Sequence, residues 1–295
     1  MPRDEWWDWH GNNIHLDTFR NANAKVKVVM LHGVGTNGRQ ISMIMGGPLY
    51  KLSNHEIETI CIDMPTYGLT QVNQKTPITY NDWIQVGSDY IDHELARDNR
   101  PIFIYGLSAG GMETYDVAAK NGKVRGIIGM TFLDQRNQDV QYTTTRNWFM
   151  GHITTPMLPG FVSLGLGRMK VRMSTASKMS ALCNNPEAQA AFMRDKTSAA
   201  NSSSLAFLNS YMHHNLIVEA TDFDVCPILL TQPAEDRWTP YRLSQHHLEQ
   251  VKKVPVEVKM LRHGGHYPVE PTALDDLHSA ALAFINKYAA KEMNA

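Results

Sequence analysis

One serine of the chain stands in a pattern suited to nucleophilic chemistry. Ser108 lies within the segment Gly106-Leu107-Ser108-Ala109-Gly110-Gly111, directly after an apolar run that ends at Tyr105. Small residues on both sides of a serine allow a sharp strand-to-helix turn, in which the hydroxyl projects above the sheet. A helix is expected directly after this segment, so the pattern predicts Ser108 as the nucleophile of an acyl-transfer reaction.

A serine hydroxyl needs a general base at neutral pH, and thirteen histidines are candidates. His266 is favoured because it lies in a loop just after the last expected strand, 256–261. In a parallel sheet the chain leaves that strand at the edge where Ser108 lies. His263 is the nearer alternative. The two histidines form an H-x-x-H pair, but no third ligand accompanies them at a suitable spacing, so we predict no metal site.

An acid must hold the base in position. Asp236 follows the expected strand 227–231, in another loop at the same edge of the sheet. The resulting chain order of nucleophile, acid and base is typical of one hydrolase fold. Two other carboxylates remain alternatives: Glu235, which is adjacent, and Asp134, which follows an earlier strand.

The reaction would build negative charge on an oxygen, and backbone N–H groups aimed at that oxygen contribute ~3–4 kcal/mol each. The segment His32-Gly33-Val34-Gly35 ends the expected strand 26–31 and places a flexible turn near Ser108. The N–H groups of Val34 and Ala109 are therefore the predicted oxyanion hole.

The elements that would position these residues follow from hydrophobic periodicity. Near-continuous apolar runs are typical of strands buried on both faces of a parallel sheet. Such runs occupy 26–31, 57–62, 102–105 and 127–130. Between the second and third run, residues 80–97 have one apolar face and are expected to be helical. Alternating strands and helices predict a parallel α/β sheet with helices on both sides.

Both ends of the chain add to this sheet. A hairpin is expected over 6–9 and 14–19, with its turn at Gly11-Asn12-Asn13. After Cys226 the alternation of strands and helices resumes. The expected elements are a strand over 227–231, a helix over 241–251, a strand over 256–261 and a helix over 273–289.

The alternation is interrupted between Asp134 and Cys226. This stretch looks helical, contains no convincing strand and holds seven of the sixteen methionines. We therefore expect a core over 1–134 and 223–295 with a helical cap over 135–222. Methionine and aromatic side chains could line an acyl-binding cavity in it. Four glycines of the cap are expected to act as hinges: Gly151, Gly160, Gly165 and Gly167. Three basic residues are expected on a solvated helix face: Arg168, Lys170 and Arg172.

Composition excludes several other classes of protein. Apolar residues make up 43% and charged residues 19% of the 295, which is typical of a globular enzyme. The net charge of −1 lacks the basic excess of a nucleic-acid-binding protein. No apolar stretch approaches the ~20 residues of a membrane span, and the N-terminus lacks the apolar core of a secretion signal. Three scattered cysteines indicate free thiols, so we expect a cytoplasmic protein.

The motifs together resemble the α/β-hydrolase superfamily over nearly the whole chain outside the interrupted stretch. The matching segments are His32 to Gly35, Asp63 to Thr70, Gly106 to Gly111, Asp236 to Pro240, and Gly265-His266. Within the superfamily the chain is most similar to capped esterases of the lysophospholipase and monoacylglycerol-lipase type. The resemblance implies a helical cap inserted after the sixth strand. It also implies, by position, Ser108 as nucleophile, Asp236 as acid, His266 as base, and Val34 with Ala109 as oxyanion hole.

Two segments depart from the family pattern. The superfamily usually has Asp-x-x-Gly-x-Gly-x-Ser at the segment that begins with Asp63, and here the segment from Asp63 to Thr70 lacks one of these glycines. Leu107 and Ala109 also replace the His and Met often seen in monoacylglycerol lipases. A serine at position 108 argues against epoxide hydrolases and haloalkane dehalogenases, which have an aspartate there.

These residues predict a serine hydrolase that cleaves a carboxylic ester, with a short- to medium-chain acyl group or a monoacyl lipid, through an acyl-enzyme intermediate. No cofactor is expected, and the expected partner is the small ester itself. The same triad would also serve a carbon–carbon bond hydrolase or a cofactor-free perhydrolase. A non-catalytic ligand sensor is a further alternative from another class. The sequence does not predict an oligomeric state.

Overall fold

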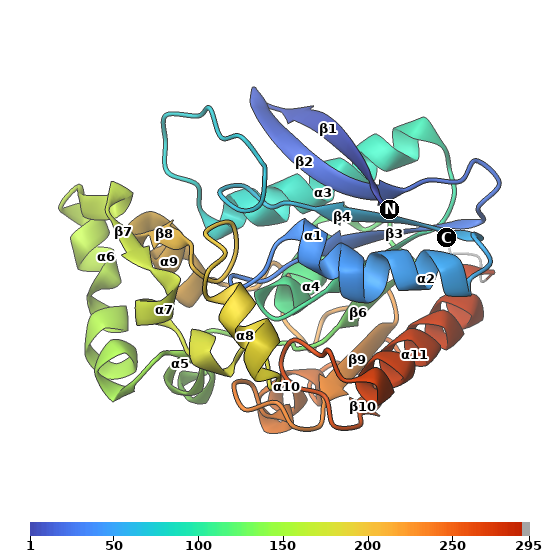
Figure 1. Ribbon diagram of the computed structural model, residues 1–295. Helices are drawn as coiled ribbons and strands as arrows, with labels where there is room; N and C mark the ends of the chain where they lie inside the picture. The colour runs from blue at the N-terminus through green and yellow to red at the C-terminus, as the bar shows by residue number, and fades with distance from the viewer. Residues whose placement is uncertain (291–295) are drawn as a thin grey trace.

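The apolar runs form the middle of an eight-stranded sheet in the computed structural model, which describes residues 1–290 (Figure 1). The strand order is β1-β2-β4-β3-β5-β6-β9-β10, and the pairs from β4 to β10 are parallel. The strands of this sheet are β1 (Arg3–Trp9), β2 (Asn12–Phe19), β3 (Val26–Leu31), β4 (Ile57–Ile62), β5 (Ile102–Gly106), β6 (Gly126–Gly129), β9 (Ile228–Pro233) and β10 (Val256–Leu261). Every residue of β3 to β6 is buried, as their apolar runs predict.

Helices cover both faces of the sheet, which confirms the expected fold class. Helices α3 and α4 pack together behind the sheet in the view of Figure 1, and α2 and α11 lie in front of it. The helices of the core are α1 (Gly38–Ile41), the π-helix η1 (Ser42–Gly46), α2 (Gly47–Leu52), α3 (Tyr80–Arg97), α4 (Ala109–Asn121), α10 (Tyr241–Leu248) and α11 (Pro271–Ala289).

The hairpin of β1 and β2 forms, but its expected turn is wrong. The turn consists of His10 and Gly11, with φ of 51° and 81°. Asn12 and Asn13 are paired strand residues opposite Trp9 and Asp8. A two-residue hairpin turn needs positive φ at both positions, and here a histidine adopts that conformation before the glycine.

The chain between β6 and β9, residues 130–227, is here named the β6–β9 segment. It lies at one end of the molecule, beyond the sheet (Figure 1). Its helices are α5 (Gln138–Thr144), η2 (Met150–Thr154), α6 (Thr155–Ser163), η3 (Leu166–Arg168), α7 (Met173–Ala176), η4 (Met179–Ala181), α8 (Pro186–Phe192) and α9 (Leu205–Met212).

The expectation that this segment holds no strand is wrong. β7 (Lys170–Arg172) pairs antiparallel with β8 (Ser202–Ser204). Arg168, Lys170 and Arg172 therefore do not share a helix face: Arg168 ends η3, and the other two lie on β7. In β7 the two basic side chains are exposed and Val171 between them is half-buried, which is the period-two alternation of a strand.

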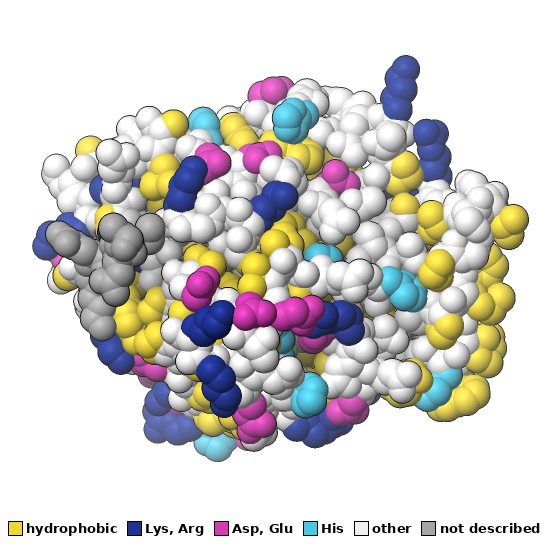
Figure 2. Space-filling view, turned by 180° about the vertical axis from the view of Figure 1, so that it is seen from behind, with side chains coloured by type: hydrophobic (Ala, Val, Ile, Leu, Met, Phe, Trp, Pro, Cys, Tyr) yellow, Lys and Arg dark blue, Asp and Glu magenta, His cyan; other side chains and the backbone are white. Residues whose placement is uncertain are grey.

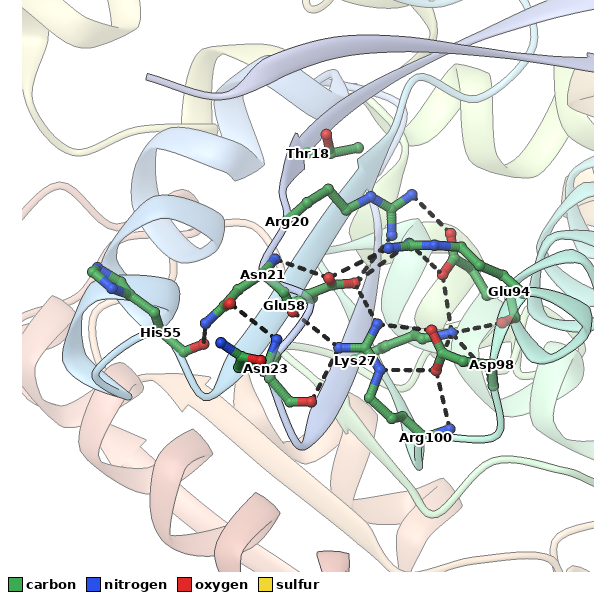
Figure 3. A network of polar contacts seen from close by, with 12 residues as sticks. Thr18, Arg20, Asn21, Asn23, Lys27, His55, Glu58, Glu94, Asp98 and Arg100 are labelled. Atoms are coloured by element: carbon green, nitrogen blue, oxygen red, sulfur yellow. Dashed lines mark hydrogen bonds and ion pairs between the residues drawn. The ribbon is translucent and has the colours of Figure 1, made fainter.

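At the amino ends of β3 and β4 a network of charged side chains joins these strands to α3 (Figure 3). Lys27 is fully buried, and its Nζ lies 3.2 Å from Glu94 Oε2 and 2.9 Å from Asp98 Oδ1. Arg20 pairs with the buried Glu58 and Glu94. These ion pairs hold the pKa of Glu94 at about 2, against its burial. Because the network lies at the edge of the sheet away from Ser108, we assign it a structural role.

Candidate active site

Ser108 stands at the sharp turn between β5 and α4. Its φ is +58° and its ψ is −124°, a conformation that side-chain-bearing residues rarely adopt. A Cβ on Gly106 would lie 2.0 Å from Gly110 O, and a Cβ on Gly110 would lie 2.5 Å from Leu31 O. Gly106 and Gly110 are therefore required by close backbone contacts. The carbonyl of Ser108 accepts hydrogen bonds from Gly111 N and Thr131 Oγ1, each at 2.8 Å.

The loop after β3 lies directly against this turn. A Cβ on Gly33 would lie 2.7 Å from Ser108 Cβ and 3.1 Å from Ala109 N, so only glycine fits. Within residues 1–290, neither Val34 N nor Ala109 N donates a hydrogen bond to another residue. Two unpaired N–H groups next to Ser108 are what an oxyanion hole requires.

Two side chains hold the loop after β3. His32 is fully buried, and its Nδ1 lies 2.8 Å from Gly33 O while its Nε2 accepts from Met64 N at 2.9 Å. Burial lowers the pKa of His32 to about 4, so the imidazole is neutral and Nδ1 carries the proton. Tyr67 donates its hydroxyl proton to Val34 O at 2.9 Å. The histidine of the His-Gly-x-Gly motif is thus a structural support for the loop.

The segment with the missing glycine is ordered around Asp63. This carboxylate accepts from Gly38 N at 2.7 Å and Leu69 N at 2.8 Å. A Cβ on Gly68 would lie 1.9 Å from Asp63 Cγ, so this glycine is needed. At the position where the family has its other glycine, Thr66 adopts a φ of +78°. The conformation is retained without the glycine, at a cost of roughly 1–2 kcal/mol.

Asp236 and His266 lie in direct contact at the carboxyl ends of β9 and β10. Asp236 Oδ2 is 2.8 Å from His266 Nδ1, and both side chains are 1% exposed. Asp236 Oδ1 accepts from the N–H groups of Trp238 and Thr239, each at 2.8 Å. Although burial opposes it, the contact with His266 and the Thr239 hydrogen bonds lower the pKa of Asp236. The carboxylate is therefore ionised at neutral pH.

The alternative residues have other partners. The Asp134 carboxylate bonds to the guanidinium of Arg136 at 2.8 Å. Glu235 Oε1 lies 2.9 Å from His263 Nδ1, and this pair is exposed. The two histidines of the H-x-x-H pair thus contact different carboxylates.

One other group of described residues has the donor atoms for a metal ion. Asp4, His15 and Asp17 offer ligand atoms within 4.8 Å of one another. The guanidinium of Arg39 pairs with both Asp4 and Asp17 and already supplies positive charge there. The cluster therefore carries no argument for a metal.

A cavity of about 760 Å³, open solvent within its rim included, lies over the turn. Ser108, Val34 and Thr239 line it together with residues of the β6–β9 segment. The apolar side chains in its wall include Leu158, Met173, Leu205, Leu208 and Met212. Met150, Met173 and Met212 line this cavity, whereas the other methionines of the segment are not among its lining residues. Such a wall suits an apolar substrate group.

The geometry divides the predicted residues into two groups. Ser108 and Ala109 lie against the loop of Val34, and Asp236 lies against His266. Ser108 Oγ makes no hydrogen bond within residues 1–290, and His266 Nε2 is buried without a partner among them. Sequence reasoning missed Tyr67 and Thr239 as site residues, although both lie inside segments that match the family.

Comparisons with known proteins agree with this fold. Residues 28–280 match the model of the alpha/beta hydrolase family. A search of curated protein sequences gave no significant match. Among solved structures, a soluble variant of monoglyceride lipase from Saccharomyces cerevisiae, in complex with a substrate analog, is similar at 13% identity and a TM-score of 0.77, covering 98% of this chain and 96% of that one.

Two further solved structures are similar in fold. The monoacylglycerol lipase of Paleococcus ferrophilus has 15% identity and a TM-score of 0.71, covering 93% of this chain and 99% of that one. A thermostable carboxyl esterase from Bacillus coagulans has 15% identity and a TM-score of 0.72, covering 98% and 99%. The family match spans most of the sequence, and the fold agrees with it. The chain therefore belongs to the alpha/beta hydrolase family.

Proposed function

We propose that the protein is a serine hydrolase that cleaves carboxylic esters through an acyl-enzyme intermediate. The observation that carries the proposal is Ser108, which stands at a strained strand-to-helix turn and lines an apolar cavity. The paired Asp236 and His266, and the free N–H groups of Val34 and Ala109, support it.

The Asp236–His266 contact and the residue types give each residue a role in this proposal. His266 Nε2 takes the proton of Ser108 Oγ, which forms a bond to the ester carbonyl carbon. The developing oxyanion accepts from Val34 N and Ala109 N. His266 returns the proton to the departing alcohol, and water then repeats the sequence to release the acid and free Ser108. Asp236 holds the imidazole and stabilises its charged form. Among the described residues Nε2 makes no other hydrogen bond, so it is free to take this proton.

The cavity wall favours a short- to medium-chain acyl group or a monoacyl lipid. We propose residues 135–222 as the cap that encloses it, with 1–134 and 223–295 as the core. Three buried free cysteines fit the cytoplasm as the proposed location.

The outer face of the proposed cap has a composition suited to lipid-like substrates. Its exposed apolar side chains include Trp148, Phe149 and Leu164, at 65%, 57% and 76% exposure. Figure 2 shows hydrophobic side chains along this end of the molecule. No Asp or Glu occurs from 140 to 186, where five Arg and Lys residues lie. Within residues 1–290, no helix is long and apolar enough to cross a membrane. This face fits approach to esters in a lipid aggregate.

Labelling with a fluorophosphonate probe tests the proposal. We expect one modified peptide containing Ser108, loss of labelling in Ser108→Ala, and unchanged labelling in Ser163→Ala, an exposed control. A panel of p-nitrophenyl esters then reads the acyl-chain preference. Absence of labelling in folded wild-type protein, or labelling that survives Ser108→Ala, contradicts the proposal.

A further inference from the structure

The hydroxyl of Thr239 touches both members of the Asp236–His266 pair. Thr239 Oγ1 lies 2.7 Å from Asp236 Oδ2 and 3.0 Å from His266 Nδ1. The backbone N–H of Thr239 also donates to Asp236 Oδ1, so this one residue contacts both carboxylate oxygens. Its side chain is held in place, since the residue is 2% exposed and its carbonyl accepts from the buried Gln232 amide at 3.1 Å.

The number of available protons determines which atom donates in each of these hydrogen bonds. An ionised carboxylate only accepts hydrogen bonds, and a hydroxyl has a single proton to donate. The Thr239 proton therefore goes to Asp236 Oδ2, and an Oγ1 lone pair faces His266 Nδ1. Both neighbours of Nδ1 are then acceptors, so Nδ1 carries the ring proton. In the neutral ring this leaves Nε2 unprotonated, which is the form that a general base requires.

We infer that Thr239 is a positioning residue, whose hydroxyl fixes the tautomer and orientation of His266 through a bond shared with Asp236. Its catalytic meaning rests on the proposed function. Without the hydroxyl, Oδ2 loses one of its two donors and Nδ1–H loses one of its two acceptors. The Asp236–His266 contact would then be held by fewer bonds, and Nε2 would be aimed less accurately at Ser108.

Thr239→Val tests this inference because valine keeps the branched shape and removes only the hydroxyl. With a p-nitrophenyl ester, we expect kcat to fall about 10-fold while KM changes less than about twofold, since the lost hydrogen bond involves a charged group. Thr239→Ser, which restores the hydroxyl, should recover most of kcat. Thr231→Val is the matched control: it removes the buried hydroxyl of a β9 threonine, which donates to Gly129 O of β6. We expect it to leave kcat unchanged.

A proton NMR measurement separates positioning from folding and from turnover. The proton resonance of His266 Nδ1–H is recorded in Ser108→Ala protein, alone and combined with each Thr239 variant. We expect the resonance to persist with Thr239→Ser and to broaden or vanish with Thr239→Val.

The outcomes distinguish the two proposals. An unlabelled wild type whose resonance still depends on Thr239 overturns the proposed function and leaves the positioning role standing. A Thr239→Val protein with unchanged kcat and resonance overturns the positioning role. Equal losses in the Val and Ser variants overturn it as well, because the hydroxyl would then not be the group that matters.

Discussion

The carboxylate of Asp236 and the imidazole of His266 lie 2.8 Å apart although 30 residues separate them in the chain. Each residue follows a different strand, and β9 and β10 pair in parallel, with Leu261 opposite Pro233. Both strands therefore release the chain at the same edge of the sheet, and the two loops meet there.

Removing the charge of Asp236 should disable the proposed base. An asparagine at this position offers an amide that can donate to Nδ1, which favours the wrong tautomer of His266. For Asp236→Asn we expect kcat on a soluble ester to fall by roughly 10³–10⁴-fold. Glu235→Gln and Asp134→Asn, made at the two alternative carboxylates, should change kcat less than about twofold. A large loss in either control, with activity kept in Asp236→Asn, would reassign the acid.

The buried His247 makes stability depend on pH. Burial lowers its pKa to about 4 from an unfolded value of 6.5. Below pH 6.5 the unfolded chain takes up a proton that the folded chain does not, so stability present above that pH is lost as the pH falls toward 4. The loss for this group is about 2 kcal/mol at pH 5.

Urea unfolding at pH 7 and pH 5 measures this contribution. From pH 7 to pH 5 the free energy of unfolding should fall by about 2 kcal/mol less in His247→Leu than in wild type. His246→Leu, on the exposed side of the same helix, should lose as much as wild type does. His32, whose pKa is also lowered to about 4, titrates in all three proteins and cancels from the comparison. Equal losses in all three would show that His247 is not the titrating group.

The strained Thr66 offers a stabilising substitution. Its side chain is exposed and its φ is +78°, so Thr66→Gly relieves strain with little loss of packing. The relief of roughly 1–2 kcal/mol exceeds the entropic cost of a glycine, about 0.5–1 kcal/mol, and we expect a higher urea midpoint. Gly68→Ala in the same turn should do the opposite, because its Cβ would lie 1.9 Å from Asp63 Cγ. A lower midpoint for Thr66→Gly would mean that the hydroxyl or methyl group stabilises the turn.

The buried Lys27 should be far more important for stability than the exposed Lys25. Lys27→Met leaves Glu94 and Asp98 without one of their cations inside the protein and should lower the free energy of unfolding by about 3–5 kcal/mol. Lys25 pairs with Glu56 at 2.6 Å, but its side chain is 71% exposed. Lys25→Met should cost less than about 1 kcal/mol. Urea unfolding at pH 7 compares the two, and similar losses would argue against the network of Figure 3 as a stabilising feature.

Local patterns predicted most elements of the sheet. The expected ranges 26–31, 57–62 and 256–261 are the observed β3, β4 and β10, and the expected helix 80–97 is α3. These segments bury continuous apolar runs or one apolar face, so their hydrophobic pattern alone predicts whether they form strands or helices. The helix expected over 241–251 instead ends at Leu248, and β7 and β8 were missed. Three-residue strands of basic and serine residues have too little apolar content to be recognised.

The sequence by itself determined the candidate residues and the family resemblance, because motifs such as Gly106 to Gly111 are short and local. Only the tertiary structure decided which carboxylate faces His266, since Asp134, Glu235 and Asp236 all follow predicted strands. The choice depends on the partner that each carboxylate contacts. Asp134 pairs with Arg136, Glu235 pairs with His263, and Asp236 pairs with His266. Such pairings join residues from separate loops, and no spacing along the chain encodes them. For the same reason, only the folded protein shows that the Thr239 hydroxyl contacts both Asp236 and His266.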